Sequence, residues 1–157
     1  MALEPIIQIF KDDIDNGEFN IAALDAGDHA CDWAYSIGLN RLYGHPELLI
    51  VGLDATFTGM LLEHLGNQVA SGMVIEPGDE IEVADGLTLR AQPVDELFAT
   101  RGDWFSLGQT VMETWGARWP QTIQLLWCDG DGRYPEEPHD NGWMLRQPLL
   151  SVASCNV

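Results

Sequence analysis

The spacing of apolar residues along the chain alternates between a helical period and a strand-like period. In Glu4–Asp15, the residues Ile7, Phe10 and Ile14 recur three or four positions apart, as on one face of a helix. Two later segments show similar spacing, and Asp54 is suited to begin one of them as an N-cap. The three predicted helices are Glu4–Asp15, Ala55 to about Ala70, and about Phe105 or Ser106 to Gly116.

Shorter apolar segments predict the strands of a sheet. Ala34–Leu39 and Leu48–Leu53 are almost wholly apolar, which is typical of buried strands, and a polar turn joins them. Alternating segments on either side of Asp85-Gly86 predict a hairpin, and Pro148 limits the last predicted strand to a sheet edge. The other predicted strands are Phe19–Leu24, Ile81–Ala84, Leu87–Val94, Thr122–Trp127 and Met144–Val152.

The order of these elements determines the expected fold class. About three helices and six or seven strands, many joined by short turns, favour an α+β fold over repeated βαβ units. We expect a mixed, mainly antiparallel sheet, with closure into a barrel as an alternative arrangement. The length of 157 residues fits a single domain, 1–157, that can bury its own core.

Acidic residues dominate the charged positions. Asp and Glu total 25 against 7 Lys and Arg, which gives a formal net charge of −18. This charge repels the phosphates of nucleic acids and anionic membrane surfaces, so neither is an expected partner. It is consistent either with a general requirement for solubility or with a basic protein partner attracted by electrostatic steering.

Composition also bears on the compartment. No apolar run approaches the ~20 residues of a membrane helix, and the N-terminal segment lacks a basic start and a long apolar stretch. The three cysteines, Cys31, Cys128 and Cys155, are irregularly spaced and odd in number, which predicts reduced thiols. We therefore expect a cytoplasmic protein.

The predicted turn between the two buried strands carries the most reactive side chains. Tyr43, His45 and Glu47 alternate around Pro46. A histidine close to a carboxylate can be held as a general base near neutral pH. The alternative interpretation is that His45-Pro46 shapes the turn and that solvent surrounds Glu47.

Other polar segments do not complete a metal-binding motif. His29, Cys31, Cys128 and His139 lack the close paired spacing of zinc ligands. The segment Asp129–Arg133 begins like a calcium-binding loop, but an arginine stands where a further acid is expected. We therefore expect a tight turn there, no metal and no cofactor.

Serine and tryptophan residues add two smaller observations. Ser36 lies inside a predicted strand rather than on an exposed elbow, which argues against a nucleophilic role. Trp104, Trp115 and Trp119 gather near the last predicted helix, where they could line a pocket or an interface or form ordinary core.

Several short motifs, taken in order, resemble the bacterial DUF4262 family, a domain of unknown function. The matching segments are Ala34–Leu39, Gly44–Leu48, Gly52-Leu53, Leu125–Trp127, Gly132–Pro135 and Gln147–Leu150. The chain departs from the family pattern at Cys128, where a proline is expected, and in the acidic loop His29–Asp32. The resemblance implies no activity, but it implies that the first stretch, the Gly132–Pro135 turn and the Gln147–Leu150 tail act together. On this basis Tyr35, Asp129, Arg133 and Gln147 are candidate ligand- or partner-binding residues.

Two functional hypotheses follow. The preferred one is a non-enzymatic, immunity- or inhibitor-like protein that binds a basic protein. The other is a small enzyme or ligand-binding domain in which His45 is the base, Glu47 orients it and Arg133 binds an anionic group. Tyr43, Asp129 and Gln147 complete that second site. Neither hypothesis sets an oligomeric state.

Overall fold

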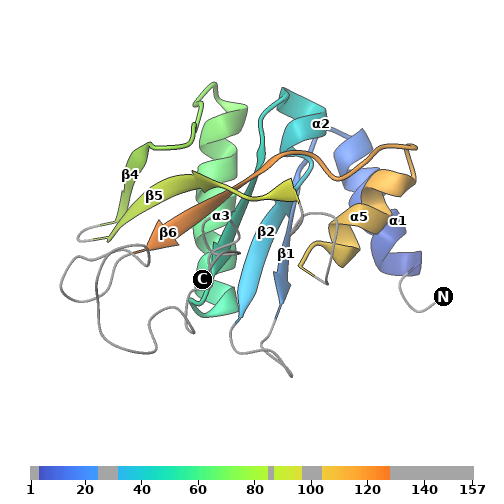
Figure 1. Cartoon of the computed structure of the whole chain (residues 1–157). Helices are drawn as coiled ribbons and strands as arrows, with labels where there is room; N and C mark the ends of the chain where they lie inside the picture. The colour runs from blue at the N-terminus through green and yellow to red at the C-terminus, as the bar shows by residue number, and fades with distance from the viewer. Residues whose placement is uncertain (1–3, 25–31, 85–86, 97–103, 128–157) are drawn as a thin grey trace.

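The structure is a computed structural model, and it describes residues 4–24, 32–84, 87–96 and 104–127. A six-stranded sheet forms its centre (Figure 1). The strands are β1 (Asn20–Leu24), β2 (Trp33–Ile37), β3 (Glu47–Val51), β4 (Glu80–Ala84), β5 (Leu87–Pro93) and β6 (Thr122–Trp127). The helices are α1 (Glu4–Asp15), α2 (Leu39–Tyr43), α3 (Ala55–Ala70) and α5 (Ser106–Glu113).

The sheet is mixed and open. Its strand order is β1-β2-β3-β6-β5-β4, and only the β3–β6 pair is parallel among the pairs described. The expectation of an α+β fold with a mainly antiparallel sheet is therefore confirmed. The alternative of a closed barrel is wrong, because β1 and β4 lie at opposite edges and do not pair with each other.

Helices cover both faces of the sheet (Figure 1). On one face α3 contributes Leu62 and Leu65 to a core cluster that includes Ile50 and Leu125 of the sheet. On the other face α1 and α5 pack over a cluster in which aromatic residues, such as Tyr35, are prominent. The strand periodicity of two explains this division, because alternate side chains of β3 enter opposite clusters.

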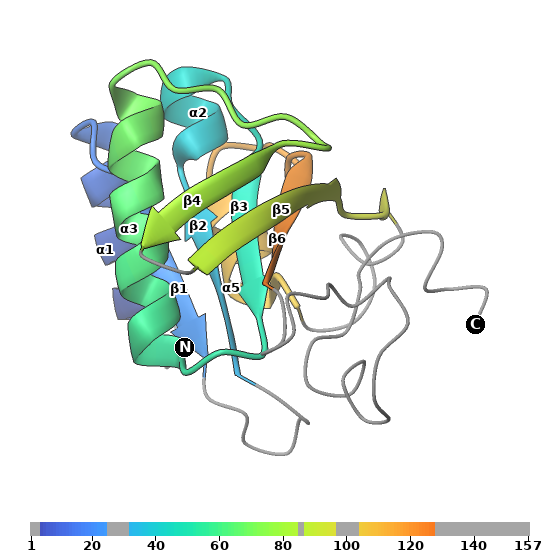
Figure 2. The same ribbon diagram turned by 90° about the vertical axis from the view of Figure 1, so that its left-hand side faces the viewer.

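The sequence predicts a simple polar turn between the two buried strands, but the structure has the short helix α2 there. Gly38 and Gly44 bound this helix with φ angles of 116° and 68°, a left-handed conformation that favours glycine. Leu39 is its fully buried residue. Figure 2 shows α2 at the ends of β2 and β3. A five-residue helix is too short to show a helical period in the sequence.

Some of the elements predicted from the sequence belong to parts of the chain that the structure does not describe. The predicted strand Met144–Val152, the Asp129–Gly132 turn and the Asp85-Gly86 turn lie outside the described residues. Within the described ranges, no helix has the length and apolar character needed to cross a membrane.

Candidate functional site

Glu47 is the first residue of β3, and its side chain is fully buried. Its Oε1 accepts hydrogen bonds from Ser36 Oγ at 2.7 Å and from the Leu39 amide at 3.1 Å. Its Oε2 accepts hydrogen bonds from the amides of Gly38 at 2.9 Å and Asn40 at 3.3 Å. Amides at the start of a helix have no partner within the helix, so the Glu47 carboxyl group serves as the cap of α2.

The environment of Glu47 changes its acidity. Burial raises the pKa of Glu47 to about 7, although the hydrogen bonds from Ser36 and the three backbone amides act in the opposite direction. A buried carboxyl group with a pKa near neutrality is often found at functional sites. Here, however, the carboxyl group is enclosed and already accepts four hydrogen bonds, so it is not placed to reach a substrate.

Ser36 is part of the same hydrogen-bond network. Its hydroxyl donates to Glu47 and accepts a hydrogen bond from the Leu48 amide at 2.9 Å. Ser36 is fully buried within the sheet. It therefore bridges β2 and β3 and is not exposed as a nucleophile.

His45 connects the end of α2 to a segment that follows α3. Its Nε2 accepts a hydrogen bond from the Ile75 amide at 2.8 Å. Because this nitrogen must be an acceptor, the neutral ring carries its proton on Nδ1, which lies 2.8 Å from the Pro46 carbonyl oxygen and donates to it. Only 5% of His45 is exposed. Both ring nitrogens are thus engaged with backbone groups, and no hydrogen bond joins His45 to Glu47 among the described contacts.

The two candidate tyrosines lie in different environments. Tyr43 ends α2, is 40% exposed, and lines a shallow depression with Glu18 and Glu63. Tyr35 is fully buried, and its hydroxyl accepts a hydrogen bond from the Gly108 amide at 3.0 Å. Burial raises the pKa of Tyr35 to about 12. Tyr43 therefore reaches the surface, whereas Tyr35 is part of the core.

The remaining candidate residues come from other parts of the chain. Asp129, Arg133 and Gln147 lie outside the described residues, as do the three cysteines and the two histidines considered as metal ligands. Within the described ranges, no group of three or more His, Cys, Asp or Glu side chains is arranged to hold a metal ion.

A groove of about 690 Å³ lies beside α5. We call it the Trp119 groove. Its lining residues are Val94, Glu96, Gln109, Glu113, Ala117, Arg118, Trp119, Pro120, Gln121 and Thr122. The Gln121 carbonyl accepts a hydrogen bond from the Glu47 amide at 3.0 Å, so the groove is at the same end of the sheet as Glu47.

The indole ring of Trp119 is held firmly in the wall of this groove. Its Nε1–H donates to Thr122 Oγ1 at 2.9 Å, and the ring stacks on Phe105 with centroids 5.1 Å apart. A Cβ atom on Gly108 would come within 2.3 Å of the ring, so α5 can approach it only because that residue is glycine. Trp119 was singled out from the sequence. Glu113 and Arg118 carried no signal there, because neither belongs to a motif.

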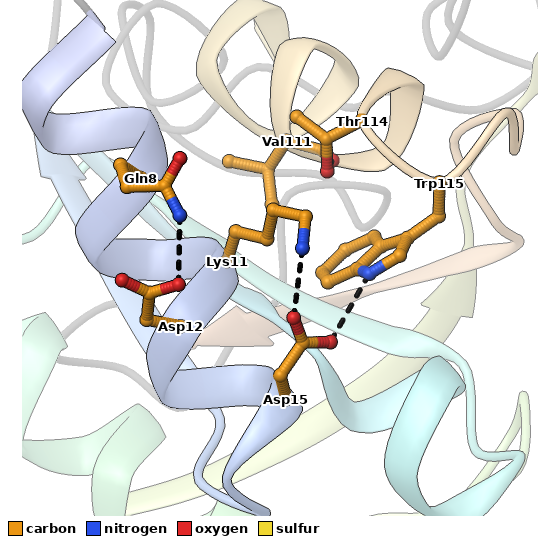
Figure 3. Close-up of polar contacts among 7 residues, drawn as sticks. All are labelled: Gln8, Lys11, Asp12, Asp15, Val111, Thr114 and Trp115. Carbon is orange, nitrogen blue, oxygen red and sulfur yellow. Dashed lines mark hydrogen bonds and ion pairs between the residues drawn. The ribbon is translucent and has the colours of Figure 1, made fainter.

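A second aromatic contact joins α1 to α5 (Figure 3). Asp15 accepts hydrogen bonds from Lys11 Nζ at 2.8 Å and from Trp115 Nε1 at 3.1 Å. The guanidinium carbon of Arg41 lies 4.1 Å from the centroid of the Trp115 ring. Trp115 and Trp119, two of the tryptophans noted in the sequence, both follow α5 along the chain but have distinct partners.

Comparisons with known proteins identify a family and nothing more specific. No curated protein and no solved structure matches the chain. The family model described as "Domain of unknown function (DUF4262)" matches residues 13–140, which is most of the chain. The resemblance found in the short motifs is thereby confirmed, and the chain belongs to the DUF4262 family.

Proposed function

We propose that this chain is a non-enzymatic binding protein that engages a basic protein partner through its acidic surface, as immunity and inhibitor proteins do. One observation carries the proposal. The two groups best suited to acid–base chemistry, His45 and Glu47, are buried and bonded to the backbone, whereas most other described carboxylates face solvent.

The distribution of charge supports the same proposal. The exposed acidic residues include Asp12, Asp15, Glu18, Asp54, Glu63, Glu76, Asp79, Glu80, Glu82, Glu96 and Glu113. Among the described bases, Lys11 pairs with Asp15 and Arg90 pairs with Glu80, which reduces their effect on the surrounding field. A surface of this kind accelerates association with a basic protein and disfavours acidic ones.

The proposal includes a cytoplasmic location. It is supported by three cysteines that are irregularly spaced and odd in number, as expected of thiols in a reducing compartment.

A second candidate function is a small enzyme or ligand-binding domain around His45, Glu47 and Arg133. The observation in its favour is the pKa of about 7 for Glu47, because perturbed carboxyl groups cluster at active sites. That candidate requires Glu47 to become accessible, since all of its bonds are now internal.

The two candidates can be separated by identifying what binds the chain in its host cells. Cross-linking followed by mass spectrometry should yield a protein with a high isoelectric point. With that partner purified, affinity should fall by at least about tenfold between roughly 50 mM and 500 mM salt, because screening weakens exposed charges. A small-molecule ligand whose binding is insensitive to salt and is lost in a folded His45→Gln variant would overturn the proposal.

A further inference from the structure

We propose that the Trp119 groove receives an arginine or lysine side chain of the basic partner. This inference rests on the proposed function and names the place where the partner is recognised. It is carried by the size of the groove, the carboxylates in its wall, and the fixed indole ring beside them.

The groove has a suitable size. Its volume of about 690 Å³ lies within the range of roughly 300–1,000 Å³ that ligand pockets occupy. One long side chain and part of the adjoining backbone can enter a space of this volume.

The polar groups of the wall favour a cation. Glu96 and Glu113 contribute carboxylates, and Gln109 and Gln121 contribute amide oxygens that can accept hydrogen bonds. The Glu113 side chain is exposed and forms no hydrogen bond or ion pair with another described residue. It is therefore available to an incoming ammonium or guanidinium group.

Trp119 adds an aromatic surface to this acidic wall. A guanidinium group is attracted to the face of an indole ring, and the interaction strengthens when water is excluded. The chain itself contains such a pair, because Arg41 lies over the ring of Trp115. Since Trp119 is held by Thr122 and Phe105 before any partner arrives, little ordering is needed on binding.

Arg118 also lines the groove, and its charge has the opposite effect. Its guanidinium group forms no hydrogen bond or ion pair with another described residue. A cationic guest is therefore repelled by Arg118 and attracted by Glu113, and this opposition predicts effects of opposite sign for the two side chains.

The test is a titration of the ¹⁵N-labelled chain with N-acetyl-L-arginine methylamide, followed through the indole N–H signals of the tryptophans. A Trp119→Phe variant assigns the signal of interest. N-acetyl-L-citrulline methylamide, which has nearly the same shape without the charge, is the control ligand. We expect the arginine compound to shift the Trp119 signal and the citrulline compound to shift it much less.

Three variants test the direction in which each charged side chain changes the affinity for the arginine compound. Glu113→Gln should weaken arginine binding by about two- to fivefold, and Arg118→Gln should strengthen it by a similar factor. Glu82→Gln is the matched control, because Glu82 is exposed on β4 and pairs with Thr88, at the opposite end of β5 from Val94. This control should leave binding nearly unchanged.

Equal binding of citrulline and arginine, or weaker binding in Arg118→Gln, would overturn the inference. Two further outcomes distinguish a failure of the groove inference from a failure of the proposed function. If a basic protein binds with strong salt dependence but Glu113→Gln and Glu82→Gln weaken it equally, the groove is not the site and the function stands. If the arginine compound binds as described but the partner found in host cells is not basic, the proposed function fails, and only the affinity of the groove for an arginine side chain is retained.

Discussion

Glu47 and Asp15 carry the same chemical group and both accept hydrogen bonds, Glu47 four and Asp15 two, yet their pKa values move in opposite directions. At Asp15, the hydrogen bond from Lys11 is the largest influence, and the pKa lies below its ordinary value. At Glu47, burial is the largest influence, and the pKa rises to about 7. Asp15 lies at the exposed end of α1, whereas Glu47 is enclosed between β2, α2 and β3.

The difference shows how far hydrogen bonds from uncharged donors can lower the pKa of a buried carboxyl group. Glu47 is contacted by a hydroxyl group and by backbone amides, none of which carries a full charge. Asp15 has fewer partners, but one of them is an ammonium group, and water surrounds the pair. Loss of hydration at Glu47 therefore outweighs its dipolar contacts, whereas at Asp15 the hydrogen bond from the Lys11 ammonium group outweighs the loss of hydration. Glu47 consequently has a structural role. Because its pKa differs between the folded and the unfolded chain, its protonation changes the free energy of unfolding.

The largest expected effect comes from removing the buried carboxyl group. Glu47→Ala leaves the amides of Gly38, Leu39 and Asn40 and the Ser36 hydroxyl without their acceptor. We expect a loss of about 3–5 kcal/mol in the free energy of unfolding, measured by urea denaturation. The control Glu113→Ala, on an exposed position, should change it by less than about 0.5 kcal/mol. A loss below about 1 kcal/mol for Glu47→Ala would contradict the role of Glu47 as the cap of α2.

The second effect is on the pH dependence of stability. The folded pKa of Glu47, about 7, lies above its ordinary value of 4.5, so the folded state binds the proton more tightly than the unfolded state. This contribution is complete below about pH 4.5 and is lost as the pH rises towards 7, with a size on the order of 3 kcal/mol. Asp15 acts in the opposite sense, and its contribution is lost only as the pH falls below its ordinary value of 3.8.

Carboxyl ¹³C NMR titration distinguishes the two groups directly. Glu47 should titrate near pH 7 and Asp15 below 3.8. Titration of Glu47 at or below 4.5 would show that its hydrogen bonds outweigh its burial, and the contrast between the two carboxyl groups would disappear.

An intermediate effect is expected at His45, a buried polar residue that is likewise bonded to the backbone. His45→Phe keeps a ring of similar size but leaves the Ile75 amide and the Pro46 carbonyl without partners. We expect a loss of about 1–3 kcal/mol in the free energy of unfolding. His64→Phe, at an exposed position of α3, is the matched control and should have little effect. ¹⁵N chemical shifts of the His45 ring should also report a proton on Nδ1, and the other tautomer would contradict the assignment.

The smallest effect is expected at Asp15. Asp15→Asn removes the ion pair with Lys11 but leaves an amide oxygen that can still accept from Trp115. We expect a small fall in the melting temperature that disappears at high salt, since the pair is exposed. Asp12→Asn is the control, because Asp12 accepts a hydrogen bond from Gln8 in place of a cation. A fall as large as that of Glu47→Ala would remove the distinction between the two carboxyl groups.

The long elements were predictable because their patterns are local. The helices Glu4–Asp15 and Ala55–Ala70 have the bounds expected from the sequence. β3 begins one residue earlier than expected, at Glu47, because a charged residue was assigned to the turn. The burial of the Glu47 carboxyl group depends on α2, whose first amides bind it. This helix is too short to be recognised from its own sequence.

The candidate site was predicted only in part. Tyr43, His45 and Glu47 are near one another in sequence, but the structure directs them to the surface, to Ile75 and to the start of α2, respectively. Trp119 was noted as a possible pocket residue, and the groove beside it is consistent with that interpretation. The charged residues of the groove, Glu96, Glu113 and Arg118, were missed because they belong to no motif and come from segments that meet only in the folded chain.

By itself, the sequence determined the types of the main elements, the α+β class, the family and the excess of negative charge, because each depends on composition or on neighbouring residues. Only the tertiary structure decided that β6 enters the sheet between β3 and β5, that Glu47 is buried, and that a groove forms beside Trp119. These features depend on contacts such as that between Tyr35 and Gly108, which are 73 positions apart. The local spacing of residues in the sequence carries no information about such a contact. The burial of Glu47, which the tertiary structure produces, raises the pKa of its carboxyl group and so determines its charge near neutral pH.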